Sequence, residues 1–172
     1  LTMVLKKAEI VPYETTGGLD TVALRMPNHP VALALLKASD ICIAAPSANT
    51  SGRPSPTKAE HVIEDMNGKI DCILDGGMVG IGIESTIVDL TGEVPMILRP
   101  GFITAQMLSE VIGEVIYDPA VLAQSPDENL KPKAPGMKYR HYAPKGELII
   151  YEGTVDKVAE KINEQKQKSC ME

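Results

Sequence analysis

The sequence contains very few aromatic residues. It has no tryptophan, one phenylalanine and five tyrosines, so aromatic residues make up 3% of the chain. Because 44% of the residues are hydrophobic, we expect a globular core, built from aliphatic side chains with methionine as filler. The shortage of aromatic rings argues against a platform on which single-stranded nucleic acid would stack.

Cysteine is also scarce, and charge of one sign is not in large excess. The three cysteines show no metal-binding or disulfide spacing, which predicts free thiols in a reducing cytoplasm. No apolar run reaches transmembrane length and no signal peptide opens the chain, so we expect no membrane association. The net charge of −6 argues against a broadly basic RNA-binding surface but leaves room for a local basic cleft.

The common catalytic motifs are absent. There is no P-loop lysine, GxGxxG, HExxH or nucleophile elbow. Ser47, Ser51 and Ser55 have no histidine near them in sequence, so serine catalysis would need one supplied by folding. Asp75 and Glu84, like other carboxylates at predicted strand ends, are expected to be structural. Apart from a serine whose histidine partner folding would have to supply, these residues indicate no protein nucleophile, and they show no metal-ligating cluster.

The most distinctive stretch is the polar, proline-rich loop Ala44 to Thr57. It follows the apolar run Ile41 to Ala44, which predicts a buried strand. Open α/β sheets place ligands in loops at the carboxyl ends of strands, and the hydroxyl and amide groups here offer neutral hydrogen bonds. The loop is either an oxyanion or nucleotide site or a well-ordered turn. Its chemistry alone leaves both interpretations open.

Hydrophobic periodicity predicts an alternation of strands and helices. Predicted strands cover 1–5, 21–25, 41–44, 70–74, 85–90, 96–98, 115–117 and 147–151. Predicted helices cover 30–38, a segment between Thr57 and Asn67, 105–112 and 155–162. Thr57 and Glu60 match a capping box, and Thr104 and Gly113 bracket the third helix. The connection 6–16 is polar and has room for a short strand.

The apolar pattern disappears between Asp118 and about Gly146, where five prolines predict a linker. After it, one strand and one helix cannot bury a core alone. We therefore expect three parts: the carboxyl-terminal part of a catalytic domain at 1–117, a linker at 118–146, and the start of a second α/β domain at 147–172. Since the chain opens inside a strand without methionine, we expect it to be a fragment.

Two arginines stand at predicted strand ends. One residue separates Arg25 from Pro27, and Pro100 directly follows Arg99. A guanidinium fixed in such a place can bind carboxylate or phosphate through two parallel hydrogen bonds. The alternative is a pair of exposed salt bridges, and the residues alone do not decide between them.

Four segments together resemble the carboxyl-terminal half of the YrdC-like domain of threonylcarbamoyl-AMP synthases. In order, they are Thr21 to Arg25 with Pro27 and His29, Pro46 to Thr57, Glu84 to Asp89, and Leu98 to Gly101. Met137 to Pro144 is similar to the linker of the family's long, two-domain form. The resemblance covers residues 1 to about 150. It implies a twisted mixed α/β sheet flanked by helices, incomplete here, then the linker and the first strand and helix of a small α/β domain.

The resemblance also implies a reaction. The family is a nucleotidyltransferase that converts L-threonine, bicarbonate and ATP, with Mg²⁺ on the ATP, into threonylcarbamoyl-AMP and pyrophosphate. Downstream tRNA-modification proteins in the cytoplasm use this product to make threonylcarbamoyladenosine. A carboxylated threonine amine attacks the α-phosphate, so the substrate supplies the nucleophile and the protein contributes positioning and charge stabilisation.

Site residues follow from the same resemblance, position by position. The ATP-binding positions are matched by Thr21, Ser47, Asn49, Ser55, Arg99 and Tyr142. The threonine-binding positions are matched by Arg25, Ala45 and Ser85. Ser47 and Asn49 form the SxN half of the family's KxR…SxN signature. The KxR half lies upstream of SxN in the family, and no KxR precedes Ser47 in this sequence. We therefore expect this chain alone to have little or no synthase activity.

Two other functions stay open. One is a YrdC-like module that binds tRNA, double-stranded RNA or a nucleotide without making the adenylate; the acidic charge counts against RNA. The other is the related carbamoyl-transfer domain of hydrogenase maturation. The Met137 to Pro144 motif counts against it, because that motif accompanies the long synthase.

Overall fold

The structure is a computed structural model that describes residues 1–122 and 149–169. Two compact units are distinguished, residues 1–142 and 143–172. The predicted boundaries at 117 and 146 stay predictions, because the linker lies largely outside the described residues. Nothing in the described helices is long and apolar enough to cross a membrane.

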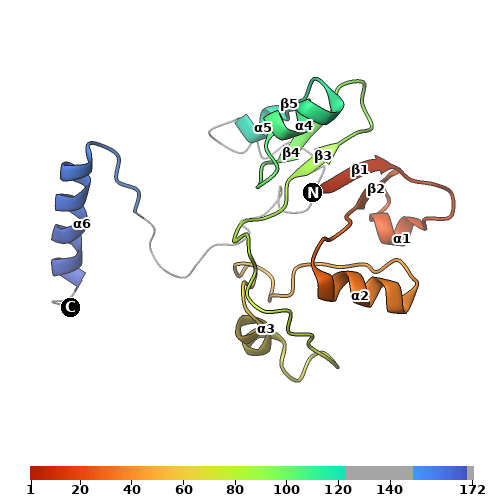
Figure 1. The fold of residues 1–172 in the computed structure, drawn as a ribbon, viewed down its shortest axis with the longest axis horizontal. Helices are drawn as coiled ribbons and strands as arrows, with labels where there is room; N and C mark the ends of the chain where they lie inside the picture. Colours follow the sequence, from red (N-terminus) through yellow and green to blue (C-terminus); the bar gives the residue numbers. More distant parts are fainter. Residues whose placement is uncertain (123–148, 170–172) are drawn as a thin grey trace. The chain divides into compact units, whose positions relative to one another are not determined.

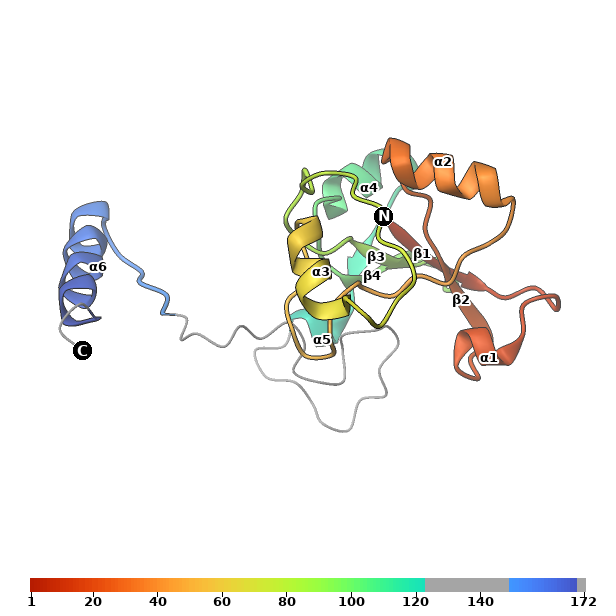
Figure 2. The same cartoon turned by 90° about the horizontal axis from the view of Figure 1, so that it is seen from below.

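The first unit is built on a five-stranded mixed sheet, which confirms the predicted fold class (Figure 1). The strand order is β2-β1-β3-β4-β5. Pairing is antiparallel for β1 with β2 and for β3 with β4, and parallel for β1 with β3 and for β4 with β5. The strands are β1 (Thr2–Lys6), β2 (Thr21–Leu24), β3 (Ile87–Asp89), β4 (Met96–Arg99) and β5 (Ile116–Tyr117). In both views β1, β3 and β4 run side by side (Figures 1 and 2).

Helices fill the connections. In chain order they are α1 (Tyr13–Thr16), α2 (Pro30–Ser39), α3 (Ala59–Met66), α4 (Ala105–Ile112) and α5 (Pro119–Leu122), with α6 (Val155–Ser169) in the second unit. Three of the predicted helices begin where expected. The Thr104 hydroxyl caps α4 by accepting the Met107 N–H at 3.2 Å, and Gly113 follows at a φ of 81°.

The core lies on both faces of the sheet, because neighbouring residues of a strand point to opposite sides. Ile87 packs with Val4 and Leu98 on one face. Its neighbour Val88 packs on the other face with Ile97 and with Leu108 of α4. The four central residues of β3 and β4 thus anchor the unit.

Two predicted strands are wrong. The runs Ile41 to Ala44 and Ile70 to Leu74 are irregular and exposed, with Ile41 66% and Leu74 59% accessible. A strand forms only beside a hydrogen-bonding neighbour, and among the described residues neither run has one. Apolar composition therefore did not predict whether these runs pair as strands.

Smaller predictions also need correction. The polar connection 6–16 contains the short helix α1 rather than a strand. Residues 149–151, the described part of the predicted strand 147–151, have no regular structure. The second-unit helix α6 extends to Ser169, beyond the predicted end at Ile162, because its polar continuation is rich in lysine, glutamine and glutamate, which favour helix.

The capping box predicted for α3 does not form. Lys58 occupies the cap position, and the Thr57 N–H donates instead to His61 Nδ1 at 3.2 Å. The expected apolar face is half open, since Ile63 is 46% accessible, whereas Asp65 is buried. In Figure 1, α3 stands away from the sheet. A polar contact, discussed below, therefore holds α3 against the preceding loop.

The segment before β3 is locked against the segment after β4. Thr86 is completely buried, and its hydroxyl donates to the Ile103 carbonyl at 2.7 Å. On its other side the Thr86 carbonyl accepts the Thr2 N–H at 2.8 Å. A Cβ built on Gly101 would lie 2.5 Å from the Thr86 nitrogen, so the two segments touch backbone to backbone. This close approach fixes the position of Ser85.

We predict that Gly101→Ala destabilises the first unit by about 1–3 kcal/mol, since overpacking forces the backbone apart. The added methyl would meet the Glu84 carbonyl and both the nitrogen and hydroxyl of Thr86. Gly92→Ala is the matched control, because the nearest atom, the Val94 carbonyl, lies 3.7 Å away. It should change stability by no more than about 0.5 kcal/mol. Urea unfolding followed by circular dichroism measures both; equal effects would contradict the packing argument.

Candidate functional site

Ser85 is the centre of a polar cluster at one edge of the sheet. Its hydroxyl accepts a hydrogen bond from Arg25 Nη1 at 3.1 Å and another from Arg99 Nη2 at 3.2 Å. Arg99 Nε also donates to the Ser85 carbonyl at 3.0 Å. The Thr2 hydroxyl lies 3.3 Å from the Ser85 hydroxyl. Two guanidinium groups therefore converge on one serine.

Sheet topology explains this convergence. Because β2 and β4 run opposite to β1 and β3, the carboxyl ends of the first pair meet the amino ends of the second. Arg25 directly follows β2, and Arg99 ends β4. Thr2 begins β1, and Ser85 lies two residues before β3. Residues 60 or more positions apart in sequence are brought to one edge in this way.

Glu84 connects the cluster to the loop Ala44 to Thr57, which is called the serine-rich loop from here on. The Ser55 hydroxyl donates to Glu84 Oε1 at 2.5 Å, while Glu84 Oε2 lies 3.8 Å from Arg99 Nη2. The side chains of Glu84 and Arg99 are 34% and 21% exposed, so the pair is reachable from solvent. The sequence interpretation of Glu84 as merely structural missed this position between loop and arginine.

The cluster favours anions. Two guanidinium groups and one carboxylate leave one positive charge in excess around Ser85. A guanidinium has five N–H donors, and the contacts described above use one of those of Arg25. Donors in a planar fork suit a carboxylate or a phosphate oxygen pair. The arrangement can therefore bind an anion at Arg25 and, if Glu84 yields, a second anion at Arg99.

The SxN residues lie in the loop and take different roles. Ser47 and Ala45 are exposed. Asn49 uses its amide nitrogen inside the loop, donating to the carbonyls of Thr50 at 3.0 Å and Arg53 at 3.1 Å. Its Oδ1 is buried and has no hydrogen-bond partner among the described residues. Asn49 thus shapes the turn that follows Ser47.

Asp65 of α3 holds this turn through both of its carboxylate oxygens. Its Oδ2 accepts the Thr50 N–H at 2.9 Å, and its Oδ1 pairs with Arg53 Nη1. Hydrogen bonding from the Thr50 backbone lowers the pKa of Asp65, and the Arg53 guanidinium lowers it further, against the opposing effect of burial. The Arg53 side chain reaches Glu64 as well, at 3.2 Å. The carboxylate is therefore ionised in the folded protein at neutral pH.

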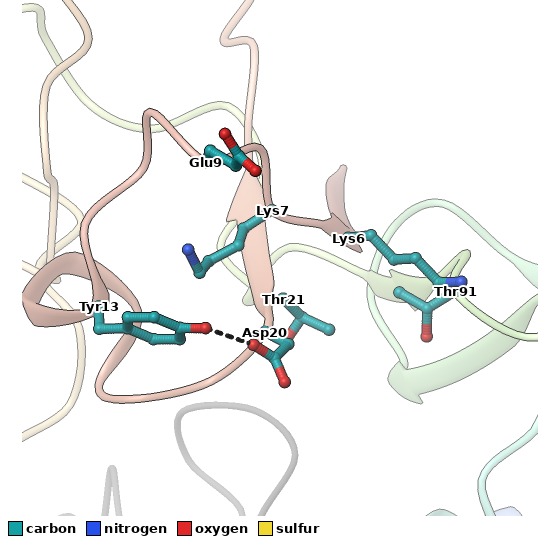
Figure 3. A pocket seen from close by; sticks show the side chains of 7 residues that line it. All are labelled: Lys6, Lys7, Glu9, Tyr13, Asp20, Thr21 and Thr91. Atoms are coloured by element: carbon teal, nitrogen blue, oxygen red, sulfur yellow. Dashed lines mark hydrogen bonds between the residues drawn. The ribbon is translucent and has the colours of Figure 1, made fainter.

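Thr21 is the described candidate that lies elsewhere. It stands at the opposite end of β2 from Arg25, about 13 Å along the strand. There it lines a separate open pocket of about 480 Å³ (Figure 3). In that pocket the Tyr13 hydroxyl donates to Asp20 Oδ1 at 2.8 Å, and the Lys7 ammonium lies 3.9 Å from the centre of the Tyr13 ring. The structure does not join Thr21 to the Ser85 cluster.

Two further observations complete the comparison with the sequence. Tyr142 lies outside the described residues, so its predicted contact with nucleotide stays a prediction. Thr2, which touches Ser85, was not a candidate, and only strand register could have pointed to it. Among residues 1–122 and 149–169, no group of three or more histidine, cysteine, aspartate or glutamate side chains is arranged to hold a metal ion.

Family models match almost the whole chain. Residues 1–101 match a family described as "Telomere recombination". Residues 103–172 match the family described as "Threonylcarbamoyl-AMP synthase, C-terminal domain".

Individual relatives agree with these matches. The threonylcarbamoyl-AMP synthase of Pyrococcus abyssi is 57% identical over 164 residues, which cover 95% of this chain and 47% of the relative. That of Bacillus subtilis is 49% identical over 168 residues, covering 97% and 47%. A crystal structure of Pyrococcus abyssi Sua5 complexed with L-threonine matches with a TM-score of 0.87 at 55% identity, over 99% of this chain and 49% of that one.

This chain therefore spans about half the length of the curated relatives that it matches. The family model that matches residues 1–101 spans Arg25, Ser85, Arg99 and the other described residues of the Ser85 cluster. The chain belongs to the threonylcarbamoyl-AMP synthase family.

Proposed function

We propose that this chain contributes part of the active site of an L-threonylcarbamoyladenylate synthase. The observation that carries the proposal is the convergence of Arg25 and Arg99 on the Ser85 hydroxyl, at 3.1 and 3.2 Å. Two anion-binding groups separated by one serine suit a reaction that joins a carboxylate-bearing amino acid to a phosphate. Relatives named threonylcarbamoyl-AMP synthase, and one crystallised with L-threonine, support this substrate pair.

The threonine side of the site is assigned to Arg25, Ser85 and Ala45. Arg25 would bind the threonine carboxylate through its free donors. Ser85 is held by both arginines. Ala45, which is exposed in the loop, is assigned by the family resemblance alone. Arg25 and Ser85 belong to the sheet edge, which is locked by Thr86 and its contact with Ile103. The amino acid would thus be oriented by the stiffest part of the unit.

The ATP side is assigned to Ser47, Asn49, Ser55, Arg99 and Tyr142. Thr21 is added on the family resemblance alone, because it stands at the other end of β2. Arg99 would neutralise phosphate charge, and the hydroxyls of Ser47 and Ser55 would donate to phosphate oxygens. In the present structure the Glu84 carboxylate contacts both the Ser55 hydroxyl and the Arg99 guanidinium. A phosphate would replace Glu84 at these two residues, because two anions cannot share one guanidinium without a net electrostatic cost.

The reaction needs no nucleophile from the protein. Threonine amine and bicarbonate give a carbamate and water, a carbamate oxygen then attacks the α-phosphorus of ATP, and pyrophosphate leaves. Most of the rate enhancement would come from holding the carbamate next to the α-phosphate. Cationic groups that neutralise the negative charge of the leaving pyrophosphate would supply the rest. Mg²⁺ would be bound through phosphate oxygens and water, in keeping with the ordinary preference of this ion.

Partners and location follow from the same proposal. Proteins that transfer the threonylcarbamoyl group to tRNA would consume the product in the cytoplasm. Direct binding of tRNA or double-stranded RNA is a further possibility that this proposal includes only as a test outcome. A gel shift that depends on salt, without affinity for ATP, would favour the RNA-binding module instead.

The proposal is tested by pyrophosphate release from ATP that depends on both L-threonine and bicarbonate. We expect little or no release by the 172-residue chain, because no KxR precedes Ser47 in it. A fusion of this chain to the part of the Pyrococcus abyssi relative that it does not match, called the fusion protein below, should release pyrophosphate. Activity of the chain alone would refute the first expectation, and an inactive but folded fusion protein would count against the proposed function.

Arg25→Ala in the fusion protein should raise the KM for L-threonine about 10- to 100-fold, the value of a charge-assisted hydrogen bond, with less effect on the KM for ATP. The KM of Arg25→Lys for L-threonine should lie between those of the unsubstituted fusion protein and Arg25→Ala. The lysine ammonium keeps the positive charge but cannot form two parallel hydrogen bonds. Lys37→Ala, an exposed cation on α2, is the control and should change neither constant. Steady-state kinetics with each substrate varied in turn decide this. Equal changes in both KM values would refute the assignment of Arg25.

Tyr142→Ala in the fusion protein should weaken the use of ATP while the thermal unfolding temperature stays unchanged. The physical reason is that an aromatic side chain over a nucleotide supplies stacking and excludes water. Tyr139→Ala, in the same predicted linker, is the matched control. Unchanged kinetics for Tyr142→Ala would mean that the linker serves only as a tether.

A further inference from the structure

A pair of charged residues joins the serine-rich loop to α3. Arg53 of the loop pairs with Asp65 through Nη1 and with Glu64 through Nη2, the latter at 3.2 Å. Asp65 also accepts the backbone N–H of Thr50 at 2.9 Å. One carboxylate thereby holds two points of the loop that are three residues apart.

Asp65 is the buried residue of α3, so the helix places a carboxylate against the loop. Asp65 is 7% exposed, whereas Ile63 on the nominal apolar face of the same helix is 46% exposed. A buried carboxylate is costly unless it is fully hydrogen-bonded and paired. Both oxygens of Asp65 have partners, and the Lys69 ammonium donates to its carbonyl at 2.8 Å. Glu64 contributes less, since its side chain is 68% exposed.

The contact reaches the nucleotide-binding hydroxyls through Asn49. The Asn49 amide donates to the carbonyls of Thr50 and Arg53, so fixing these two residues also fixes Asn49. Ser47 lies two residues before this turn, and Ser55 lies two residues after it. Ser55 is then held on the sheet side by Glu84 at 2.5 Å. The loop is therefore tied to α3 in its middle, at Thr50 and Arg53, and to the sheet edge at Ser55.

We infer that Arg53 and Asp65 are positioning residues that contact no substrate and hold the loop in the shape that presents Ser47 and Ser55 to phosphate. Asn49 connects these two positioning residues to Ser47, because its amide nitrogen donates to the carbonyls of Thr50 and Arg53. The inference rests on the proposed function for its kinetic consequence. Its structural consequence, a loop that opens when the pair is broken, is independent of any activity.

The structural consequence is tested in the 172-residue chain by hydrogen exchange. Asp65→Asn and Arg53→Ala should speed exchange of the amides in 47–55 by about 10-fold or more, while β1, β3 and β4 keep their protection. Glu60→Gln, an exposed acid one turn earlier on α3, should leave the loop unchanged. Unaltered exchange in the loop of Asp65→Asn would overturn the inference, whatever the protein catalyses.

The kinetic consequence is tested in the fusion protein. Arg53→Ala and Asp65→Asn should raise the KM for ATP about 5-fold or more and leave the KM for L-threonine within about 2-fold, because Arg25 and Ser85 stand on the sheet. Arg53→Lys should recover part of the loss, since it restores charge without the two-pronged contact. A parallel rise in both KM values would overturn the inference. Absence of activity in the unsubstituted fusion protein would count against the proposed function alone, and hydrogen exchange would still decide the role of the pair.

Loop protection should also depend on pH in a defined direction. The charged groups that act on Asp65 are Arg53 from the loop and Lys69 just beyond α3, and Glu64 shares Arg53. Because the folded protein holds the pKa of Asp65 below its unfolded value of about 3.9, the stabilisation is complete above that pH and is lost as the pH falls through the folded pKa. The difference in loop exchange between the unsubstituted chain and Asp65→Asn should therefore persist at pH 5 and shrink below pH about 3.9. A difference that stays constant down to pH 2 would contradict ionic anchoring.

Discussion

The site depends on the close approach of two backbone segments, one before β3 and one after β4. Gly101 permits it, because a side chain there would collide with the Thr86 nitrogen at 2.5 Å. The buried Thr86 hydroxyl completes the contact by donating to Ile103. With this pair of segments locked, Ser85 has one position, and the arginines from β2 and β4 can both reach it. The electrostatic contacts of the whole cluster therefore depend on one steric requirement, the absence of a side chain at Gly101.

Two parts of the site are held by different forces. Arg25 and Ser85, two of the three residues assigned to threonine, stand on the sheet edge beside the core of β3 and β4. The hydroxyls assigned to phosphate stand on a loop that is held by charge, through Arg53 and Asp65 on one side and Glu84 on the other. Such a loop can change its partners when an anion arrives without disturbing the core. The phosphate hydroxyls of Ser47 and Ser55 therefore stand on the part held by charge, whereas Arg25, Ser85 and Arg99 stand on or next to the sheet.

The apolar runs Ile41 to Ala44 and Ile70 to Leu74 show what the described fold leaves unpaired. Both have the composition of buried strands, and both are exposed and irregular here. Together with the half-open face of α3, they gather apolar surface around the serine-rich loop rather than around the sheet edge. The sheet edge accordingly carries the better-defined half of the site.

The sequence by itself determined the local structure and the chemistry of the candidates. Periodicity and capping residues identified α2, α4 and the strands of the hairpin Ile87 to Arg99, because these features depend on near neighbours. The family resemblance identified Arg25, Ser55, Ser85 and Arg99 as candidate site residues. Only the tertiary structure decided which of them meet, that Glu84 stands between Ser55 and Arg99, and that Thr21 lies at the far end of its strand. It also decided that two strand-like runs have no pairing strand among residues 1–122 and 149–169. Hydrogen-bond partners and contacts of distant segments follow from topology and close packing, which no local pattern specifies.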